Sequence, residues 1–379
     1  MSVWSDLPGQ SAVIEQLSRA AAAERPAHAW LFTGPPGSGR SNAAKSFAAA
    51  LLCEQQDPAE RGCATCHACR TVLAGSNADA TVVATENVTF SIQEMRDLVG
   101  KAQDKPSSGR WRVIIIEDAD RMTERTTNVL LKAIEEPPPR TIWILCTPSP
   151  ADVLVTIRSR CRPVSLRIPP ADDVAALLVR RDGADPELAG FAARVSQSHI
   201  GVARRLASDA DARHRRDTIV RLPLRLRGVA DAVTAAGELV DISNADAAAA
   251  SEQRNEAERE ALLIALGAPE KGAMPPAIRS QLKRLEEDQK RRAKRSLSDS
   301  LDRVLIDLST FFRDVLTVQL GTGTELVNEY LREDLTSYAE RSTPEQTLGR
   351  MDAIAQARQR LGTNVAPVLA MEAMAVSLL

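Results

Sequence analysis

Residues 34–41 read Gly34-Pro35-Pro36-Gly37-Ser38-Gly39-Arg40-Ser41, and this stretch decides the fold. It matches the phosphate-binding pattern G-x-x-x-x-G-K-[ST] at every position except one, where Arg40 replaces lysine. The apolar run Ala29–Thr33 precedes it, and helical sequence from Arg40 to Leu52 follows it. A strand, a glycine-rich loop and a helix in this order predict a P-loop in an α/β domain, with an ordinary Gly-Pro loop as the alternative.

The residues of the loop indicate what it could bind. Gly34, Gly37 and Gly39 allow backbone amides to turn inward around a phosphate, and the hydroxyl of Ser41 could hold Mg²⁺. Lysine would place a compact charge between the β- and γ-phosphates, whereas the guanidinium of Arg40 is larger and planar. We therefore expect ATP and Mg²⁺ to bind weakly or not at all.

A second departure follows the predicted strand Trp111–Ile116. A Walker B strand usually ends in Asp and then Glu, which order the Mg²⁺-bound water and polarise the attacking water. Here Glu117 precedes Asp118, so each carboxylate has the side-chain length expected at the other position. A displacement of about 1 Å matters for such chemistry. Both departures predict that this chain hydrolyses no ATP of its own.

Strand and helix signals alternate up to Pro170 and then change. Further strands are predicted at Thr81–Ala84 and Thr141–Cys146, and helices at Ala12–Ala23, Ser91–Lys101 and Thr123–Glu136. This alternation favours a doubly wound α/β domain.

The rest of the chain is predicted to be helical. Short helices are predicted at Asp172–Arg181, Pro186–Val195 and Gly201–Ala207. From about Arg213 every segment is predicted helical, with an apolar stripe at Leu301, Leu305, Leu308 and Phe312. We expect a P-loop core over 1–167, a three-helix lid over 168–212 and an all-α domain over 213–379.

Composition excludes several classes of protein. With 48 basic and 50 acidic residues among 379, the formal net charge is −2, which is unlike a histone-like DNA binder. The 12 aromatic residues (4 Trp, 2 Tyr, 6 Phe) are too few for a platform that stacks single-stranded bases. No apolar run is long enough to cross a bilayer, and residues 1–10 lack a secretory signal, so we expect a cytoplasmic protein without a membrane partner.

One segment carries a local excess of positive charge, unlike the nearly neutral chain as a whole. Arg279–Arg295 carries eight basic and three acidic residues, 8 − 3 = +5. It is either the solvated face of a helix or a contact for a DNA backbone or a protein partner.

Four of the six cysteines lie close together in the sequence. They are spaced C-x₉-C-x₂-C-x₂-C, at Cys53, Cys63, Cys66 and Cys69. Four thiolates could surround Zn²⁺ tetrahedrally and leave no open position for water, so the spacing predicts a structural zinc site. Four free thiols are the alternative, as is His67 as a substitute ligand. A zinc-dependent nucleic-acid module is disfavoured, since only Arg61 and Arg70 lie nearby. Cys146 and Cys161 are predicted to be reduced packing residues.

Several segments together resemble one family. Residues 128–138, NVLLKAIEEPP, resemble the N-A-L-L-K-x-L-E-E-P segment of bacterial DNA polymerase III clamp-loader subunits, an AAA+ family. Ser159-Arg160-Cys161 matches the S-R-C motif of that family, residues 28–32 resemble its H-A-[YW]-L-F segment, and Gly9-Gln10 resembles its adenine-side pair. The four cysteines resemble its zinc module. The resemblance covers residues 1–210 and, more loosely, Asn364–Leu379.

The resemblance implies an AAA+ core, a lid and a helical collar in a hetero-pentamer with delta and gamma/tau subunits, which loads a sliding clamp on primed DNA. The departures at Arg40, Glu117 and Asp118 are similar to the delta-prime branch, a stator that does not depend on its own ATP turnover. An ATP-hydrolysing subunit of the gamma/tau type is the alternative.

The resemblance also implies roles for three further residues. Arg160 would act as an arginine finger in the ATP site of a neighbouring gamma/tau subunit, where such a residue stabilises charge on the transferred phosphoryl group. From the residues alone, a surface salt bridge near the end of a strand is the alternative for Arg160. Thr147 matches the sensor-1 position and Arg204 the sensor-2 position. Both could instead be ordinary polar residues at the end of an element.

Overall fold

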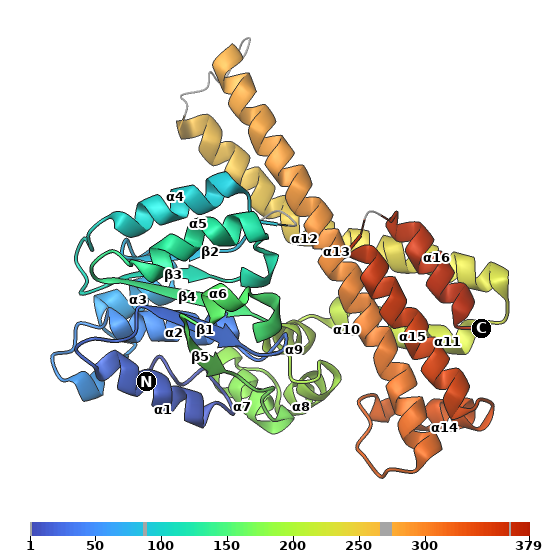
Figure 1. The fold of residues 1–379 in the computed structure, drawn as a ribbon. Helices are drawn as coiled ribbons and strands as arrows, with labels where there is room; N and C mark the ends of the chain where they lie inside the picture. Colours follow the sequence, from blue (N-terminus) through green and yellow to red (C-terminus); the bar gives the residue numbers. More distant parts are fainter. Residues whose placement is uncertain (1, 86–88, 266–274, 364) are drawn as a thin grey trace. The chain divides into compact units, whose positions relative to one another are not determined.

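The computed structural model describes residues 2–85, 89–265, 275–363 and 365–379 (Figure 1). The chain forms two compact units, Met1–Ser208 and Asp209–Leu379. The first contains a parallel sheet with helices on both faces, and the second contains only helices among its described elements. The expected fold class, an α/β P-loop domain followed by short helices and an all-α region, is confirmed.

The sheet has five parallel strands in the order β2-β3-β4-β1-β5. They are β1 (Ala29–Thr33), β2 (Ala80–Val83), β3 (Arg112–Ile116), β4 (Thr141–Thr147) and β5 (Arg162–Ser165). Four of these were predicted. The sequence pattern does not predict β5, because this four-residue edge strand contains Pro163 and buries only Val164. Proline is tolerated at such an edge, where a ladder hydrogen bond is not needed on both sides.

Every residue of β1, β3 and β4 is buried, because helices cover both faces of the sheet. Alternate side chains supply two cores: Trp30 and Phe32 lie in one, and Leu31 and Trp143 in the other. The first core includes residues from α1 (Ser11–Ala22), α2 (Arg40–Leu51) and α3 (His67–Leu73). The second includes residues from α4 (Ile92–Gln103), α5 (Glu124–Glu135) and α6 (Val155–Arg158).

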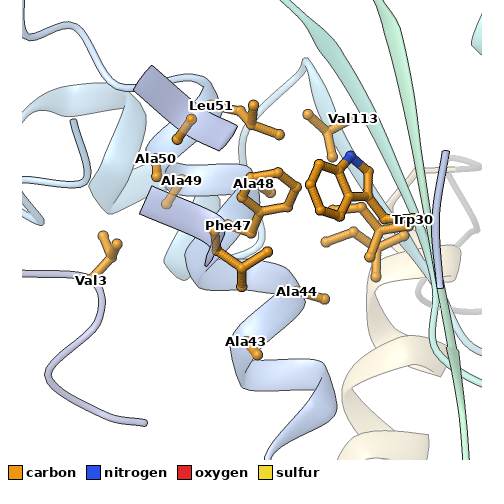
Figure 2. Close-up of a cluster of buried hydrophobic side chains, with 14 of the residues drawn as sticks. Val3, Trp30, Ala43, Ala44, Phe47, Ala48, Ala49, Ala50, Leu51 and Val113 are labelled. Carbon is orange, nitrogen blue, oxygen red and sulfur yellow. The ribbon is translucent and has the colours of Figure 1, made fainter. Parts of the chain in front are cut away.

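Helix α2 lies close against the sheet because its inner face is made of small residues and one aromatic ring (Figure 2). Ala43, Ala44 and Ala48 are fully buried, and the Phe47 ring meets the Trp30 ring edge to face at 4.9 Å between centroids. Edge-to-face aromatic pairs add to the burial energy of the rings. This packing fixes the first turn of α2, which carries Arg40 and Ser41.

Three short helices follow the sheet, as expected. They are α7 (Ala171–Asp182), α8 (Pro186–Val195) and α9 (Ile200–Ser208). Gly183 ends α7 in the left-handed conformation, and the Asp185 carboxylate accepts the amides of Glu187 and Leu188 at the start of α8.

The second unit is built on two long helices. Its elements are α10 (Ala210–Val220), α11 (Leu222–Arg225), α12 (Val229–Ala265), α13 (Pro276–Leu320), α14 (Arg332–Glu340), α15 (Pro344–Leu361) and α16 (Pro367–Ser377), with a 3₁₀ turn at Glu329–Leu331. The predicted stripe Leu301, Leu305, Leu308 and Phe312 is fully buried. The predicted closing helix over 364–379 corresponds to α16, and residue 364 lies outside the described residues.

The helical prediction for this unit is interrupted after α13. Gly321 ends the helix at φ +59°, and buried Asp314 then accepts the amides of Val327 and Asn328. These hydrogen bonds satisfy the amides of Val327 and Asn328 and hold the end of the loop against the helix.

The segment Arg279–Arg295 lies in the first half of α13. Arg279 and Lys283 are exposed, and Arg292 pairs with Glu258 of α12. A contact of this segment with a DNA backbone or a protein partner stays a prediction. None of the helices in the described part of the chain is long and apolar enough to span a membrane.

Candidate functional site

The glycine loop joins β1 to α2 at the carboxyl edge of the sheet. Thr33 lies opposite Thr147 of β4 and Ser165 of β5, so the segments that follow these three strands meet around the loop. The Gly34 amide donates to the Pro148 carbonyl at 3.2 Å. Gly37 (φ +86°) and Gly39 (φ +88°) adopt conformations that side-chain-bearing residues rarely take. The loop therefore has the backbone shape that the sequence pattern predicted.

Arg40 folds back over its own loop. Its Nη1 donates to the carbonyl oxygen of Gly34, the first residue of the loop. Burial lowers the pKa of Arg40, although Cys146, Asp120 and Asp118 lie close enough to oppose this shift. The guanidinium therefore bonds within the loop, whereas a lysine at this position would direct its charge toward a bound phosphate.

Ser38 retains a feature of a ligand-binding loop. Its side chain is buried, and its hydroxyl has no hydrogen-bond partner among the residues that the structure describes. An unsatisfied buried hydroxyl is costly unless a ligand or water completes it. The Ser38 hydroxyl is therefore a group of this loop that a ligand or water would complete.

The first of the two carboxylates after β3 is paired with a lysine. Glu117 Oε1 lies 3.1 Å from Lys45 Nζ, so this carboxylate is paired with an ammonium group on α2. Asp118 lies near Arg40 and next to Asp120, whose pKa is raised by burial. An ammonium at Glu117 competes with Mg²⁺ for the same oxygen.

The two predicted sensor residues make other contacts. Thr147 is fully buried, and its hydroxyl donates to the Ser149 carbonyl at 3.1 Å. Arg204 Nε lies 3.2 Å from Asp182 Oδ1, and 63% of the Arg204 side chain is exposed.

The lid meets the glycine loop at the start of α9. A Cβ atom built on Gly37 would lie 2.7 Å from His199 Cα, and one built on Gly39 would lie 3.8 Å from Ile200 Cδ1. The N-terminal end of α9 therefore closes over the loop. The sequence does not indicate His199, because this residue belongs to no recognisable motif.

Arg160 lies away from the loop, after α6. Its side chain is 41% exposed, and its Nη2 lies 2.7 Å from Glu135 Oε1 at the end of α5. Its Nη1 donates to the Thr156 carbonyl at 2.8 Å. Arg160 is therefore accessible at the surface of this unit, which a residue acting in another subunit must be.

The four cysteines of the predicted metal site come together. Cys53 follows α2, Cys63 follows the 3₁₀ turn Pro58–Glu60, and Cys66 and Cys69 lie at the start of α3. Cys53 Sγ lies 3.7 Å from Cys63 Sγ and 3.9 Å from Cys66 Sγ, and all four sulfurs lie within 4.8 Å of one another. Sulfurs about 2.3 Å from a tetrahedral zinc lie about 3.8 Å apart. The cluster can hold a metal ion.

Backbone hydrogen bonds support this cluster. The Cys66 amide donates to Cys63 Sγ at 3.3 Å, and the Cys69 amide donates to Cys66 Sγ at 3.4 Å. Burial opposes ionisation of Cys63, but hydrogen bonds from Thr65 and Cys66 outweigh it and lower the Cys63 pKa to about 5. His67 is exposed and lies outside the group of four sulfurs.

Cys146 and Cys161 are buried free thiols, and burial raises the pKa of each to about 12. Such thiols are unreactive, in agreement with a packing role.

Comparison with known proteins finds similarity to subunits of DNA polymerase III. Residues 9–170 match a family model described as DNA polymerase III, delta subunit. The chain is 36% identical over 161 residues to DNA polymerase III subunit tau of Bacillus subtilis, covering 42% of this chain and 28% of the relative. It is 37% identical over 157 residues to subunit delta′ of Pseudomonas aeruginosa, covering 41% of this chain and 46% of the relative.

These matches therefore span less than half of either relative. A solved Thermotoga maritima protein related to the DNA polymerase III gamma subunit aligns with 92% of this chain and 99% of its own, at 15% identity and a TM-score of 0.34.

Proposed function

We propose, from the match of residues 9–170 to the DNA polymerase III delta subunit family, that this protein is a delta-prime-type subunit of a bacterial clamp loader. In this proposal it assembles with delta and gamma/tau subunits into a hetero-pentamer that loads the sliding clamp on primed DNA in the cytoplasm. Residues 1–167 are the AAA+ core, 168–212 the lid and 213–379 the collar that joins the subunits.

The observation that carries the proposal is the contrast between two arginines. Arg40 is bonded to the Gly34 carbonyl inside the loop, while Arg160 is exposed. Lys45 also pairs with Glu117, the residue that should serve Mg²⁺-dependent hydrolysis. These contacts support a subunit that turns over no ATP itself and supplies Arg160 to the site of a neighbour.

Arg160 would act there as an arginine finger. Its side chain places a fixed positive charge at a surface, and such a charge stabilises the negative charge that develops on the transferred phosphoryl group. The residues of its own loop, Gly34 to Ser41, would have a structural part in this subunit.

The cysteine cluster would hold one structural zinc ion. Zinc with four thiolate ligands has no open coordination position, so it would supply no catalysis and would tie the end of α2 to α3. Cys53, Cys63, Cys66 and Cys69 fit this role by their mutual distances.

An ATP-hydrolysing subunit of the gamma/tau type is the second candidate, because the chain is also 36% identical to a tau subunit over 161 residues. The Arg40 and Lys45 contacts weigh against it, since both place protein groups where nucleotide and Mg²⁺ would bind.

The proposal is tested in a reconstituted pentamer. The gamma/tau subunits carry alanine at their own S-R-C arginine, so Arg160 is the remaining finger. With the natural chain, one gamma/tau site should hydrolyse ATP, and Arg160→Ala should lower that rate on the order of 10³-fold. Arg160→Lys should restore little, because a point charge does not reproduce the planar fork.

Two controls accompany this measurement. Size-exclusion chromatography should show the same pentamer with each variant, and the isolated chain should show negligible turnover. An isolated chain that hydrolyses ATP at about 10 s⁻¹, an ordinary enzyme rate, would favour the gamma/tau alternative.

A further inference from the structure

The ion pair between Arg160 and Glu135 joins the ends of two helices that share one core. Ile134, next to Glu135, and Ile157, in α6, are both fully buried in the core on that face of the sheet. Glu135 is the last residue of α5, and Arg160 follows Ser159 at the end of α6. The packing of Ile134 and Ile157 therefore fixes the backbone that carries the two charged side chains.

The guanidinium of Arg160 is held at two of its nitrogens. Nη2 lies 2.7 Å from Glu135 Oε1, and Nη1 donates to the Thr156 carbonyl at 2.8 Å and to Ser159 Oγ at 3.3 Å. The Thr156 and Ser159 contacts are local to α6, whereas Glu135 comes from a different helix. Glu135 is therefore the contact that fixes the direction of the side chain relative to the core.

Stability is a poor explanation for this contact. The two side chains are 41% and 39% exposed, and an ion pair at such exposure adds little to the free energy of unfolding. The ion pair has a larger effect on the orientation of the Arg160 side chain than on stability. An unrestrained arginine has many rotamers and must lose that freedom each time it binds a phosphate.

We infer that Glu135 is a positioning residue for Arg160: it holds the guanidinium in the direction from which it reaches the neighbouring ATP site. This inference rests on the proposed role of Arg160. Because Glu135 is itself partly exposed, water screens its charge, so it orients the fork without cancelling the positive charge that the phosphate meets.

The test uses the pentamer in which Arg160 is the remaining finger. Glu135→Ala should lower kcat for ATP by about 10-fold, since loss of positioning costs rate in the transition state. The KM for ATP should not change. Glu135→Gln should keep most of the activity, because its amide oxygen still accepts from Nη2. Glu136→Ala is the matched control, an exposed glutamate one residue further along; in the part of the chain that the structure describes, Arg160 forms its ion pair with Glu135 and not with Glu136.

A double substitution decides whether Glu135 acts through Arg160. The Glu135→Ala, Arg160→Ala pair should be no slower than Arg160→Ala alone, because two residues that act through one group are not additive. An unchanged or raised kcat with Glu135→Ala, or a further loss in the pair, would overturn the inference. If Arg160→Ala itself has no effect, the proposed function of Arg160 fails first, and this outcome is distinct from failure of Glu135 alone.

Discussion

Arg40 and Arg160 lie in the same compact unit, but their side chains have different environments. Arg40 is partly buried, and a backbone carbonyl six residues earlier accepts its hydrogen bond. Arg160 is exposed and paired with a carboxylate from another helix. The difference shows that the arginine of the glycine loop forms its hydrogen bond within that loop, while Arg160 lies at the surface of its unit and bonds a different helix. Three predictions test this comparison.

The largest effect is expected at the metal cluster, which lies just beyond the other end of the helix that begins with Arg40. Cys66→Ser removes one of the four proposed ligands, while the serine hydroxyl can still accept from the Cys69 amide at the start of α3. Because metal binding and folding are coupled, zinc content should fall from one per chain towards zero. The free energy of unfolding should drop by more than about 4 kcal/mol, as for other substitutions that remove a metal.

Elemental analysis and thermal unfolding measure the two effects. Cys146→Ser is the control, a buried cysteine outside the cluster, and it should keep the full zinc content. Natural protein without zinc and with four titratable thiols at these positions would rule out a metal site. Normal zinc content in the Cys66→Ser chain would instead show that Cys66 is not a ligand.

The next effect concerns Arg40. The lysine in Arg40→Lys has no planar guanidinium to bond the Gly34 carbonyl across the loop. That carbonyl should therefore lose its hydrogen bond, and the lysine amine should face the phosphate. Nucleotide affinity should rise at least about tenfold, which is about 1.4 kcal/mol. Isothermal titration calorimetry of the isolated chain measures this change.

Arg40→Ala is the matched variant, since it also releases Gly34 but adds no charge, and its affinity should rise less. Hydrolysis should stay negligible in both, because Lys45 still pairs with Glu117. Equal affinities for the natural chain and the lysine variant would show that the contact with Gly34 does not block the loop.

The smallest effect is expected for the stability of the Arg160→Ala chain. Since the Arg160 side chain is 41% exposed and its pair with Glu135 is solvated, the free energy of unfolding should change by about 0.5 kcal/mol or less. Urea denaturation of the isolated chain is the measurement. A loss of several kcal/mol would mean that Arg160 serves its own fold, as Arg40 does.

The sequence predicted the features that depend on local pattern. The glycine loop, four of the strands, the three short helices and the grouping of four cysteines follow from spacing, apolar periodicity and ligand chemistry. It could not predict β5, because Pro163 and a single buried valine give a weak strand pattern. Nor could it predict that Lys45 meets Glu117 or that Glu135 meets Arg160, since these pairs join segments far apart in the chain.

Helix α13 has 45 residues, and at about 1.5 Å per residue it is about 68 Å long. Its fully buried stripe, Leu301 to Val315, occupies only the second half. The first half pairs with α12 through contacts such as Arg292 to Glu258. Ile278 and Leu282 of this first half are also buried, but they lie outside the core cluster of the second unit. Whole turns added to or removed from both helices together would therefore change the reach of the pair while leaving that core cluster in place.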